Sequence, residues 1–167
     1  MTTFALRQLK LRTGEQFEDE VEIDLEPLLL GGQEYEPVPP AAPARLTVTK
    51  AATGSMYELA FRVELHGPCF RCLADAKLAP SIRAREYHAT KAGDEELRSP
   101  YVGDEALDLS AWARDAIALA LPDKILCRHD CAGLCPTCGK DLNVEPHAHE
   151  ETVADSRWSA LEALRED

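Results

Sequence analysis

Alternating apolar and polar positions predict neighbouring β-strands near the middle of the chain. In residues 57–65, Tyr57, Leu59 and Phe61 alternate with charged or small residues, which is the period of a half-buried strand. Residues 45–50 alternate in the same way, with a turn sequence between the two segments. Residues 76–87 also alternate, but they contain a proline, which predicts an edge strand or a bulge. We therefore expect an antiparallel sheet in this region.

The N-terminal part of the chain has a less regular pattern. Residues 4–11 and 17–23 have enough apolar positions for two strands. Residues 24–30 predict a short helix with Asp24 as its N-cap and a Gly-Gly pair after its end. The proline-rich residues 31–43 predict an extended linker or loop between this helix and the alternating segments.

Helical periodicity is clear in the second half of the chain. Residues 109–121 place their large apolar side chains on one face, Asp108 precedes them as an N-cap, and Pro122 ends the helix. A second short helix is predicted at residues 156–165, with Trp158 on its apolar side. Both tryptophans of the chain are expected to be core residues.

Six cysteines and two late histidines predict a metal site. Cys69 and Cys72 follow the strand of residues 57–65, so they are expected at the tip of a hairpin, where a tight turn presents two thiolates to one side. Closely spaced thiolates, with Gly and Pro to turn the backbone, suit tetrahedral Zn²⁺. The other candidate ligands lie in one segment after the helix: Cys127, Cys131, Cys135, Cys138, His147 and His149.

Eight candidate ligands are enough for two tetrahedral sites, and their spacing leaves the division between the sites open. One division is the two-knuckle arrangement of a zinc ribbon, with Cys69, Cys72, Cys135 and Cys138. The other combines Cys69, Cys72, Cys127 and Cys131, and leaves Cys135, Cys138, His147 and His149 for a second site.

The predicted elements together indicate an α+β fold. We expect an antiparallel β-sheet with packed helices and a Cys-rich zinc-binding segment. A chain of 167 residues is long enough for one ordinary domain with its own core. We therefore predict a single domain over residues 1–167, in which residues 127–149 form the Cys/His metal-binding segment.

Charge and composition narrow the class of protein. The net charge of −12 argues against a surface that binds nucleic acid all over, because affinity for phosphate rests on clustered Lys and Arg. No apolar run is long enough for a membrane span, and the first residues lack the pattern of a signal peptide. We expect a cytoplasmic protein, where clustered cysteines are more often metal ligands than disulfides.

The sequence contains no recognisable catalytic motif. It has no Gly-x-Ser-x-Gly, no glycine-rich phosphate loop and no His-Glu-x-x-His. A catalytic zinc needs an open coordination position and a nearby general base, whereas an excess of thiolates favours a closed structural site. We therefore expect that the protein is not an enzyme and has no small-molecule substrate.

Three motifs in a fixed order resemble the bacterial YceD family. They are Gly-Pro-Cys-Phe-Arg-Cys-Leu at 67–73, Ile-Ala-Leu-Ala-Leu-Pro at 117–122, and the segment from Cys127 to Asn143 with its Cys-Pro-Thr-Cys-Gly. The family is known as the large ribosomal RNA subunit accumulation proteins and was earlier described as predicted metal-binding proteins. Asp-Ser-Arg at 155–157 is similar to the family's Asp-Pro-Arg, with Ser156 in place of Pro.

The resemblance implies both a ligand division and a function. Many members have Cys-x-Cys where this chain has His147-Ala148-His149, so the second site would have mixed ligands. Members that lack the Cys-Pro-x-Cys-Gly portion tend to keep the other ligands, which favours a core site made by Cys69, Cys72, Cys127 and Cys131. The implied role is in accumulation, processing or assembly of large-subunit ribosomal RNA, with that RNA or a ribosomal protein as partner.

Two surfaces could serve such a role. Arg71, Lys77, Arg83 and Arg85 gather near the first cysteine pair, and regular strand geometry places the last three on one face. We predict that these four residues form an RNA-binding face. The alternative is a protein–protein adapter, stabilised by zinc, whose acidic surface binds a basic ribosomal protein.

Overall fold

The computed structural model describes residues 1–90, 94–103 and 105–149. Within these residues the chain forms antiparallel strands, two short 3-10 helices and one α-helix. The elements are β1 (Thr3–Ala5), η1 (Leu6–Gln8), β2 (Gln16–Asp24), β3 (Leu28–Leu30), β4 (Gln33–Pro37), β5 (Ala41–Lys50), β6 (Gly54–Arg62), β7 (Leu65–Pro68), β8 (Asp75–Leu78), β9 (Ser81–Ala89), η2 (Glu95–Leu97), β10 (Val102–Gly103), β11 (Ala106–Asp108) and α1 (Leu109–Ala120).

The largest sheet has the strand order β2-β5-β6-β9, and every neighbouring pair is antiparallel. The predicted pairing of residues 45–50 with the strand that begins near Tyr57 is confirmed, with Leu46 opposite Leu59. Alternation turns Leu46, Leu59 and Phe61 to one buried face. The opposite face of the sheet carries mostly polar and charged side chains.

A second sheet, β3-β4-β7-β8, continues the first one toward the cysteines. The predicted single strand at 57–65 is in fact two strands, β6 and β7. The strand β6 pairs with β9 in the first sheet, and β7 pairs with β8 in the second. Between them, the backbone N–H of Val63 bonds to the carbonyl of Pro80. The predicted strand at 76–87 divides into β8 and β9 at the same level. The result is one long hairpin that runs through both sheets and has Cys69 and Cys72 at its tip.

The helix predicted at residues 24–30 is wrong. Residues 28–30 form β3, which pairs with β4 across a two-residue turn at Gly31 and Gly32. Both glycines have positive φ, 57° and 81°, which hairpin turns of this length require. Leu28 is buried and Leu29 is exposed, so the leucines follow a strand period of two.

The proline-rich linker predicted at residues 31–43 is also wrong in large part, since it contains β4 and the start of β5. Pro43 is tolerated in β5 because it pairs only with Glu22 of β2, whereas the pairing of β5 with β6 begins at Ala44. A residue without an N–H therefore removes no bond from the middle of the sheet.

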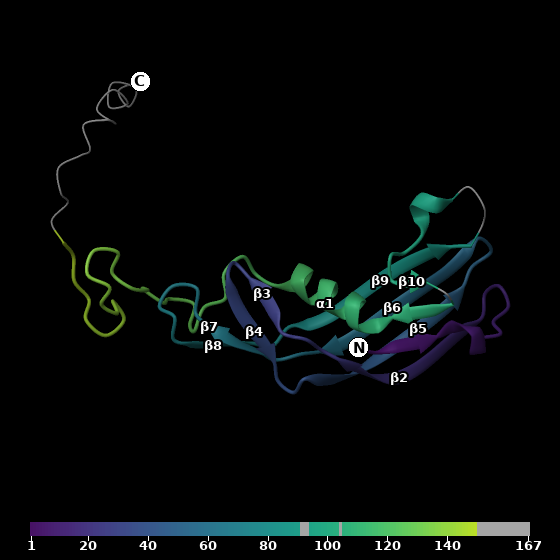
Figure 1. The fold of residues 1–167 in the computed structure, drawn as a ribbon, viewed down its shortest axis with the longest axis horizontal. Helices are drawn as coiled ribbons and strands as arrows, with labels where there is room; N and C mark the ends of the chain where they lie inside the picture. Colours follow the sequence, from purple (N-terminus) through teal and green to yellow (C-terminus); the bar gives the residue numbers. More distant parts are fainter. Residues whose placement is uncertain (91–93, 104, 150–167) are drawn as a thin grey trace, which may run out of the picture.

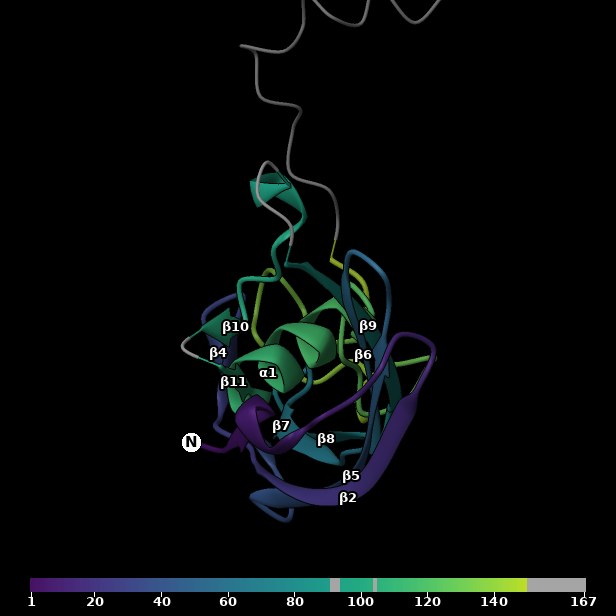
Figure 2. The ribbon, with the colours of Figure 1, turned by 90° about the vertical axis from the view of Figure 1, so that its right-hand side faces the viewer.

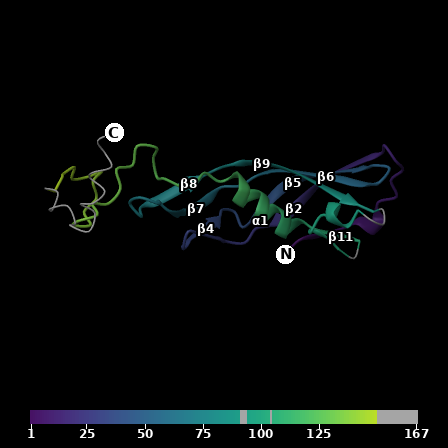
Figure 3. The ribbon, with the colours of Figure 1, turned by 90° about the horizontal axis from the view of Figure 1, so that it is seen from above.

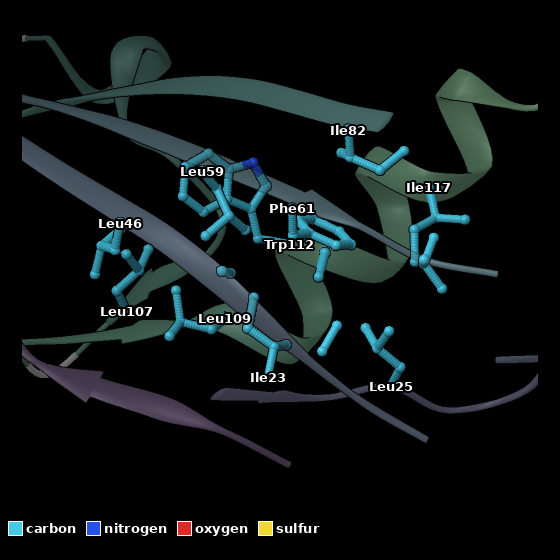
Figure 4. Close-up of a cluster of buried hydrophobic side chains, with 14 of the residues drawn as sticks. Ile23, Leu25, Leu46, Leu59, Phe61, Ile82, Leu107, Leu109, Trp112 and Ile117 are labelled. Atoms are coloured by element: carbon cyan, nitrogen blue, oxygen red, sulfur yellow. The ribbon is translucent and has the colours of Figure 1, made fainter. Parts of the chain in front are cut away.

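The predicted helix at 109–121 is confirmed as α1. Asp108 caps it by accepting a hydrogen bond from the backbone N–H of Ala111 at 3.0 Å. Figure 4 shows Trp112 of α1 among Leu59, Phe61 and Leu109, where the helix packs on the inner face of the large sheet. The short sheet β1-β11-β10 leads into the helix.

The predicted fold class needs correction. The described residues are mainly antiparallel sheets with a single α-helix, so the fold is not an α+β fold with several packed helices. The short leucine run at 28–30 belongs to a hairpin because its turn residues and burial pattern are those of strands. The second predicted helix, at 156–165, lies outside the described residues.

The molecule is elongated, with the Cys-rich segment at one end (Figures 1 and 3). Seen along the long axis, the strands curve around α1 (Figure 2). A smaller core near the tip contains Tyr35, Cys69, Ile125 and Cys131. The partly buried Leu30 and Leu121 pack against both cores and join them.

The buried face of α1 generates a stability prediction. Trp112 is 2% exposed and its ring stacks on Tyr101 at a centroid distance of 6.2 Å. Trp112→Ala should lower the free energy of unfolding by about 3–5 kcal/mol, because it removes buried apolar area and leaves a cavity. Urea denaturation followed by circular dichroism measures this change.

Leu119→Ala, on the same helix, is the matched control. Leu119 is 89% exposed, so its truncation should change the free energy of unfolding by less than about 0.5 kcal/mol. Equal losses in the two variants would contradict the packing of α1 described here.

Candidate metal centre

The tip of the long hairpin positions the first cysteine pair. The backbone N–H of Cys69 bonds to the carbonyl of Ala74 at 2.7 Å, and the N–H of Leu73 bonds to the carbonyl of Cys69 at 3.0 Å. Leu73 has a φ of 62°, which closes the turn tightly. Both thiols consequently face the same side of the hairpin, as the hairpin prediction required.

The chain that leaves α1 returns to this tip. The N–H of Phe70 bonds to the carbonyl of Ile125 at 2.8 Å, so the segment before Cys127 is tied to the hairpin by backbone. The Sγ atoms of Cys69 and Cys131 lie 3.8 Å apart, and those of Cys72 and Cys127 lie 3.6 Å apart.

These distances fit a metal-bound set of thiolates. All four Sγ atoms lie within 4.8 Å of one another. A tetrahedral Zn²⁺ with bonds of ~2.3 Å holds its sulfurs about 3.8 Å apart. A disulfide needs an S–S distance of about 2.05 Å, and all six cysteines are free thiols. The arrangement could hold one metal ion.

The thiols of this group differ in acidity. Burial raises the pKa of Cys69, but backbone N–H groups of Cys72, Cys127 and Arg71 outweigh it and lower the pKa to about 6. Burial and the neighbouring thiols raise the pKa of Cys127 to about 12. The first thiolate therefore makes the ionisation of its neighbours harder, and a cation would relieve this repulsion.

A second group forms within the Cys-rich segment itself. The ligand atoms of Cys135, Cys138, His147 and His149 lie within 4.8 Å of one another. The N–H of Cys135 bonds to the carbonyl of Lys140, which closes the turn that carries Cys138. Nε2 of His147 lies 3.1 Å from Sγ of Cys138.

Hydrogen bonds orient the side chains of the second group. Nδ1 of His147 lies 2.7 Å from the carbonyl of Glu145, which fixes the ring and leaves Nε2 directed at the cysteines. This contact and the nearby Cys135 raise the pKa of His147. Backbone N–H groups of Cys138 and Thr137 lower the pKa of Cys135 to about 6, although burial opposes them. Such outer contacts are typical of metal-ligating histidines.

Two residues that the sequence reasoning did not assign to the site support the first group. Asn143 donates from its side-chain nitrogen to Sγ of Cys131 at 3.5 Å, and its side-chain oxygen accepts from the N–H of Ala132 at 2.8 Å. Arg71 donates to the carbonyl of Cys131 at 2.5 Å. Asn143 could have been predicted as part of the site, because it belongs to the Asp-Leu-Asn that ends the third family motif.

Gly133 allows the close approach of the two cysteine loops. Its φ is 81°, and a Cβ atom there would lie 3.2 Å from both Cβ and the carbonyl oxygen of Arg71. The N–H of Leu134 bonds to that same carbonyl at 3.2 Å. A larger residue at position 133 would push the segment away from the hairpin.

The structure groups the eight predicted ligands in the division that the family resemblance favours. Cys69, Cys72, Cys127 and Cys131 come together, and Cys135, Cys138, His147 and His149 form the other group. The zinc-ribbon division, with Cys135 and Cys138 next to Cys69 and Cys72, is not the grouping found.

The predicted RNA-binding residues are more dispersed than the ligands. Lys77 lies on β8 and contacts Glu64 at 3.8 Å, whereas Arg83 and Arg85 lie on β9 of the other sheet. Arg85 pairs with Glu58 at 2.8 Å. The guanidinium group of Arg71 donates a hydrogen bond to the carbonyl of Cys131, so it is already engaged within the protein. Within the described residues, Arg83 forms no ion pair.

Comparison with known proteins supports one family. The model of the family "Large ribosomal RNA subunit accumulation protein YceD" matches residues 57–165, which includes both cysteine stretches. No solved structure matches the chain significantly.

Curated relatives match a similar part of the chain. Uncharacterized proteins of Mycobacterium bovis and Mycobacterium tuberculosis are each 41% identical to it over 101 residues, which is 57% of this chain and 48% of theirs. The uncharacterized protein YlbN of Bacillus subtilis is 28% identical over 102 residues, 58% of each chain. The chain thus spans about half the length of the first of these relatives.

The contacts of Asn143 generate a prediction that needs no metal. Asn143→Ala should increase the rate at which Cys131 reacts with a thiol reagent, because it removes an N–H···S contact and the bond to Ala132. Peptide mass spectrometry after timed alkylation measures the rate for each cysteine. Val144→Ala, at a neighbouring position that is 77% exposed, is the control. An unchanged rate at Cys131 would show that Asn143 does not support the site.

Proposed function

The chain belongs to the YceD family of large ribosomal RNA subunit accumulation proteins, because the family model covers more than half of its length, and from this premise we propose a function. The protein is a non-enzymatic, zinc-binding factor of the cytoplasm. It acts in the accumulation of large-subunit ribosomal RNA, through RNA processing or subunit assembly. The observation that carries the zinc assignment is the spacing of the four sulfurs at the hairpin tip.

Zinc suits the donor sets better than a harder cation does. Four thiolates, or two thiolates with two imidazoles, are soft and borderline ligands, whereas Mg²⁺ and Ca²⁺ prefer oxygen. Cys69 and Cys131 are fully buried, so little of the first site is open to a substrate. Four protein ligands also leave no open coordination position, which supports a structural ion and a non-enzymatic protein.

The proposed ion in the first group would fasten the chain after α1 to the hairpin. The small core there contains few large side chains, mainly Tyr35 and Ile125 next to the cysteines. Hydroxyl donation from Tyr35 to the carbonyl of Pro68 at 2.9 Å adds a further tie. So small an apolar core is weakly stable alone, and metal binding would supply the missing free energy.

An RNA contact is supported by arginines on the outer face of the large sheet. Cross-strand register places Arg45 and Arg83 on either side of Ala60, with Arg62 two residues farther along β6. Arg45 and Arg62 were not among the predicted residues, because their proximity to Arg83 depends on register. Arginine guanidinium groups bind phosphate oxygens well.

The protein–protein adapter is the second candidate. Its support is β2, an edge strand of the large sheet on which Glu18, Glu20 and Glu22 are exposed on one face. Arg45 already pairs with Glu18 at 3.2 Å, so the basic and acidic parts of this face adjoin. A basic ribosomal protein would be attracted to the acidic edge.

Metal analysis tests the zinc proposal. The purified protein should contain close to two Zn per chain, and Cys69→Ser should lose one of them and unfold at a lower temperature. His149→Ala should affect the melting temperature less, because His149 is exposed and its group closes only a local loop. Elemental analysis and calorimetry provide the measurements. Metal-free protein with an intact fold would refute the proposal.

Binding across a salt series separates the two functional candidates. Wild-type protein should bind large-subunit RNA fragments with an affinity that falls steeply with salt. Arg83→Glu with Arg85→Glu should reduce the log–log slope by roughly 0.7–0.9 for each lost phosphate contact. Arg98→Glu with Arg114→Glu makes the same charge change at exposed positions outside the strands of the large sheet and is the control.

The cellular role has its own measurement. Cells that depend on the Arg83/Arg85 variant should accumulate less large-subunit RNA relative to small-subunit RNA than cells with the control variant. Poor RNA binding by the wild-type protein, together with tight binding of a basic ribosomal protein, would favour the adapter. Normal RNA accumulation in cells without the protein would refute both candidates.

A further inference from the structure

A cavity lies at the end of the molecule opposite the cysteines. Its volume is about 430 Å³, and it is lined by the ends of β5, β6 and β9, by the N-terminal segment from Leu6 to Leu11, and by β10. The end of β5 at Lys50 and the start of β6 at Gly54 form the turn remote from the hairpin tip (Figure 1). The cavity is therefore separate from both proposed metal sites.

A row of polar side chains interrupts the apolar inner face at this end of the sheet. Lys50 is opposite Ser55, and Ser55 is opposite His88, so the three residues are direct cross-strand neighbours. Alternation turns them to the same side as Val48 and Tyr57, which are buried in the core. Ser55 is itself only 8% exposed. Polar residues at core-facing positions are expected where the fold serves a binding function.

One buried group in this row lacks a partner. Nδ1 of His88 is buried and has no hydrogen-bond partner among the described residues. Buried polar atoms are nearly always satisfied, so this unpaired nitrogen needs an explanation, and a water or a bound group beside the ring is one. His88 is one of the residues that line it.

The cavity also has an excess of positive charge. Lys10 and Lys50 line it, and neither forms an ion pair within the part of the chain that the structure describes. Arg7 pairs with Glu105, and this pair also lines the cavity. In a chain with a net charge of −12, two cations that face a common cavity and have no carboxylate partner among the described residues indicate an anionic ligand.

The donors and the lining indicate the class of ligand. Two ammonium groups, the hydroxyl of Ser55 and the imidazole of His88 can serve the several oxygens of a phosphomonoester, which carries about −1.5 to −2 charges. The rest of the lining is largely leucine and valine side chains, which suit a flat apolar body. The volume lies in the range of small-ligand pockets.

We propose that this cavity binds the phosphomonoester of a nucleotide. The phosphate lies between Lys10, Lys50 and His88, and the base lies among the aliphatic side chains. Such a phosphomonoester occurs in a free mononucleotide and also at the 5′-phosphate end of an RNA.

Titration calorimetry of the 167-residue protein as purified tests the proposal with 5′-AMP and adenosine. The nucleotide should bind, and adenosine should bind at least about tenfold more weakly, since a charge-assisted hydrogen bond contributes about 1.5–3 kcal/mol. Lys50→Ala and Lys10→Ala should each lower the affinity for 5′-AMP by about tenfold or more. Lys140→Ala, which removes an exposed cation that pairs with Glu145 in the Cys-rich segment, should leave the affinity unchanged.

A second variant removes a hydroxyl donor from the cavity without a change of charge. Ser55→Val should weaken the binding of 5′-AMP, because it removes one hydrogen-bond donor, while melting temperature and zinc content show that the variant folds. If Ser55→Val does not fold, the two lysine variants decide the question, because both lysines lie at the partly open side of the site.

Short RNAs with 5′-phosphate and 5′-hydroxyl ends distinguish the two sources. Tighter binding of the 5′-phosphate RNA than of the 5′-hydroxyl RNA identifies an RNA end as a ligand of the cavity, because any contact with the arginines of the outer sheet face is the same for both RNAs. Equal binding of the two RNAs, with 5′-AMP still preferred over adenosine, identifies a free nucleotide. Equal affinity for 5′-AMP and adenosine, no binding of either in the millimolar range, or unchanged affinity in both lysine variants would each overturn the proposal.

Discussion

The antiparallel pairing of one long hairpin is the interaction on which the rest of the structure depends. Its two strands, β6 continued by β7 and β8 continued by β9, take part in both four-stranded sheets. The same hairpin supplies Leu59 and Phe61 to the main core and carries Cys69 and Cys72 at its tip. A change in its register would therefore disturb the core and the candidate metal centre together, because every side chain would move to the other face.

The sequence predicted the parts of the fold that have a long, regular period. Alternation identified the strand that begins at Tyr57, and helical spacing with the cap at Asp108 identified α1. The prediction from sequence was wrong at residues 24–30, because a short leucine run fits both the helical and the strand period. The two glycines after it, which have positive φ, form the turn of a hairpin. Local propensity cannot resolve such short segments, because pairing with β4 and burial in the core determine their structure.

The candidate ligands were predictable, but their division was not predictable from spacing alone. It depends on the path of the chain after α1, which the Phe70–Ile125 backbone bond brings back to the hairpin. The roles of Asn143 and Arg71 depend on the same path. The cluster of Arg45, Arg62 and Arg83 likewise results from strand register, which no single segment of the sequence records.

The two candidate metal groups differ in how much of the chain they enclose. The sulfur contacts of the first group join residues 55 and 62 positions apart, whereas the contact of Cys138 with His147 spans nine. A long loop has a larger closure entropy than a short one, so the first group can assemble only after the hairpin and α1 have met. The second can close as soon as its own short segment has been synthesised. With ions in both groups, as proposed, the local group could take its ion first, and occupancy of the first group would report that the hairpin and the segment after α1 have come together.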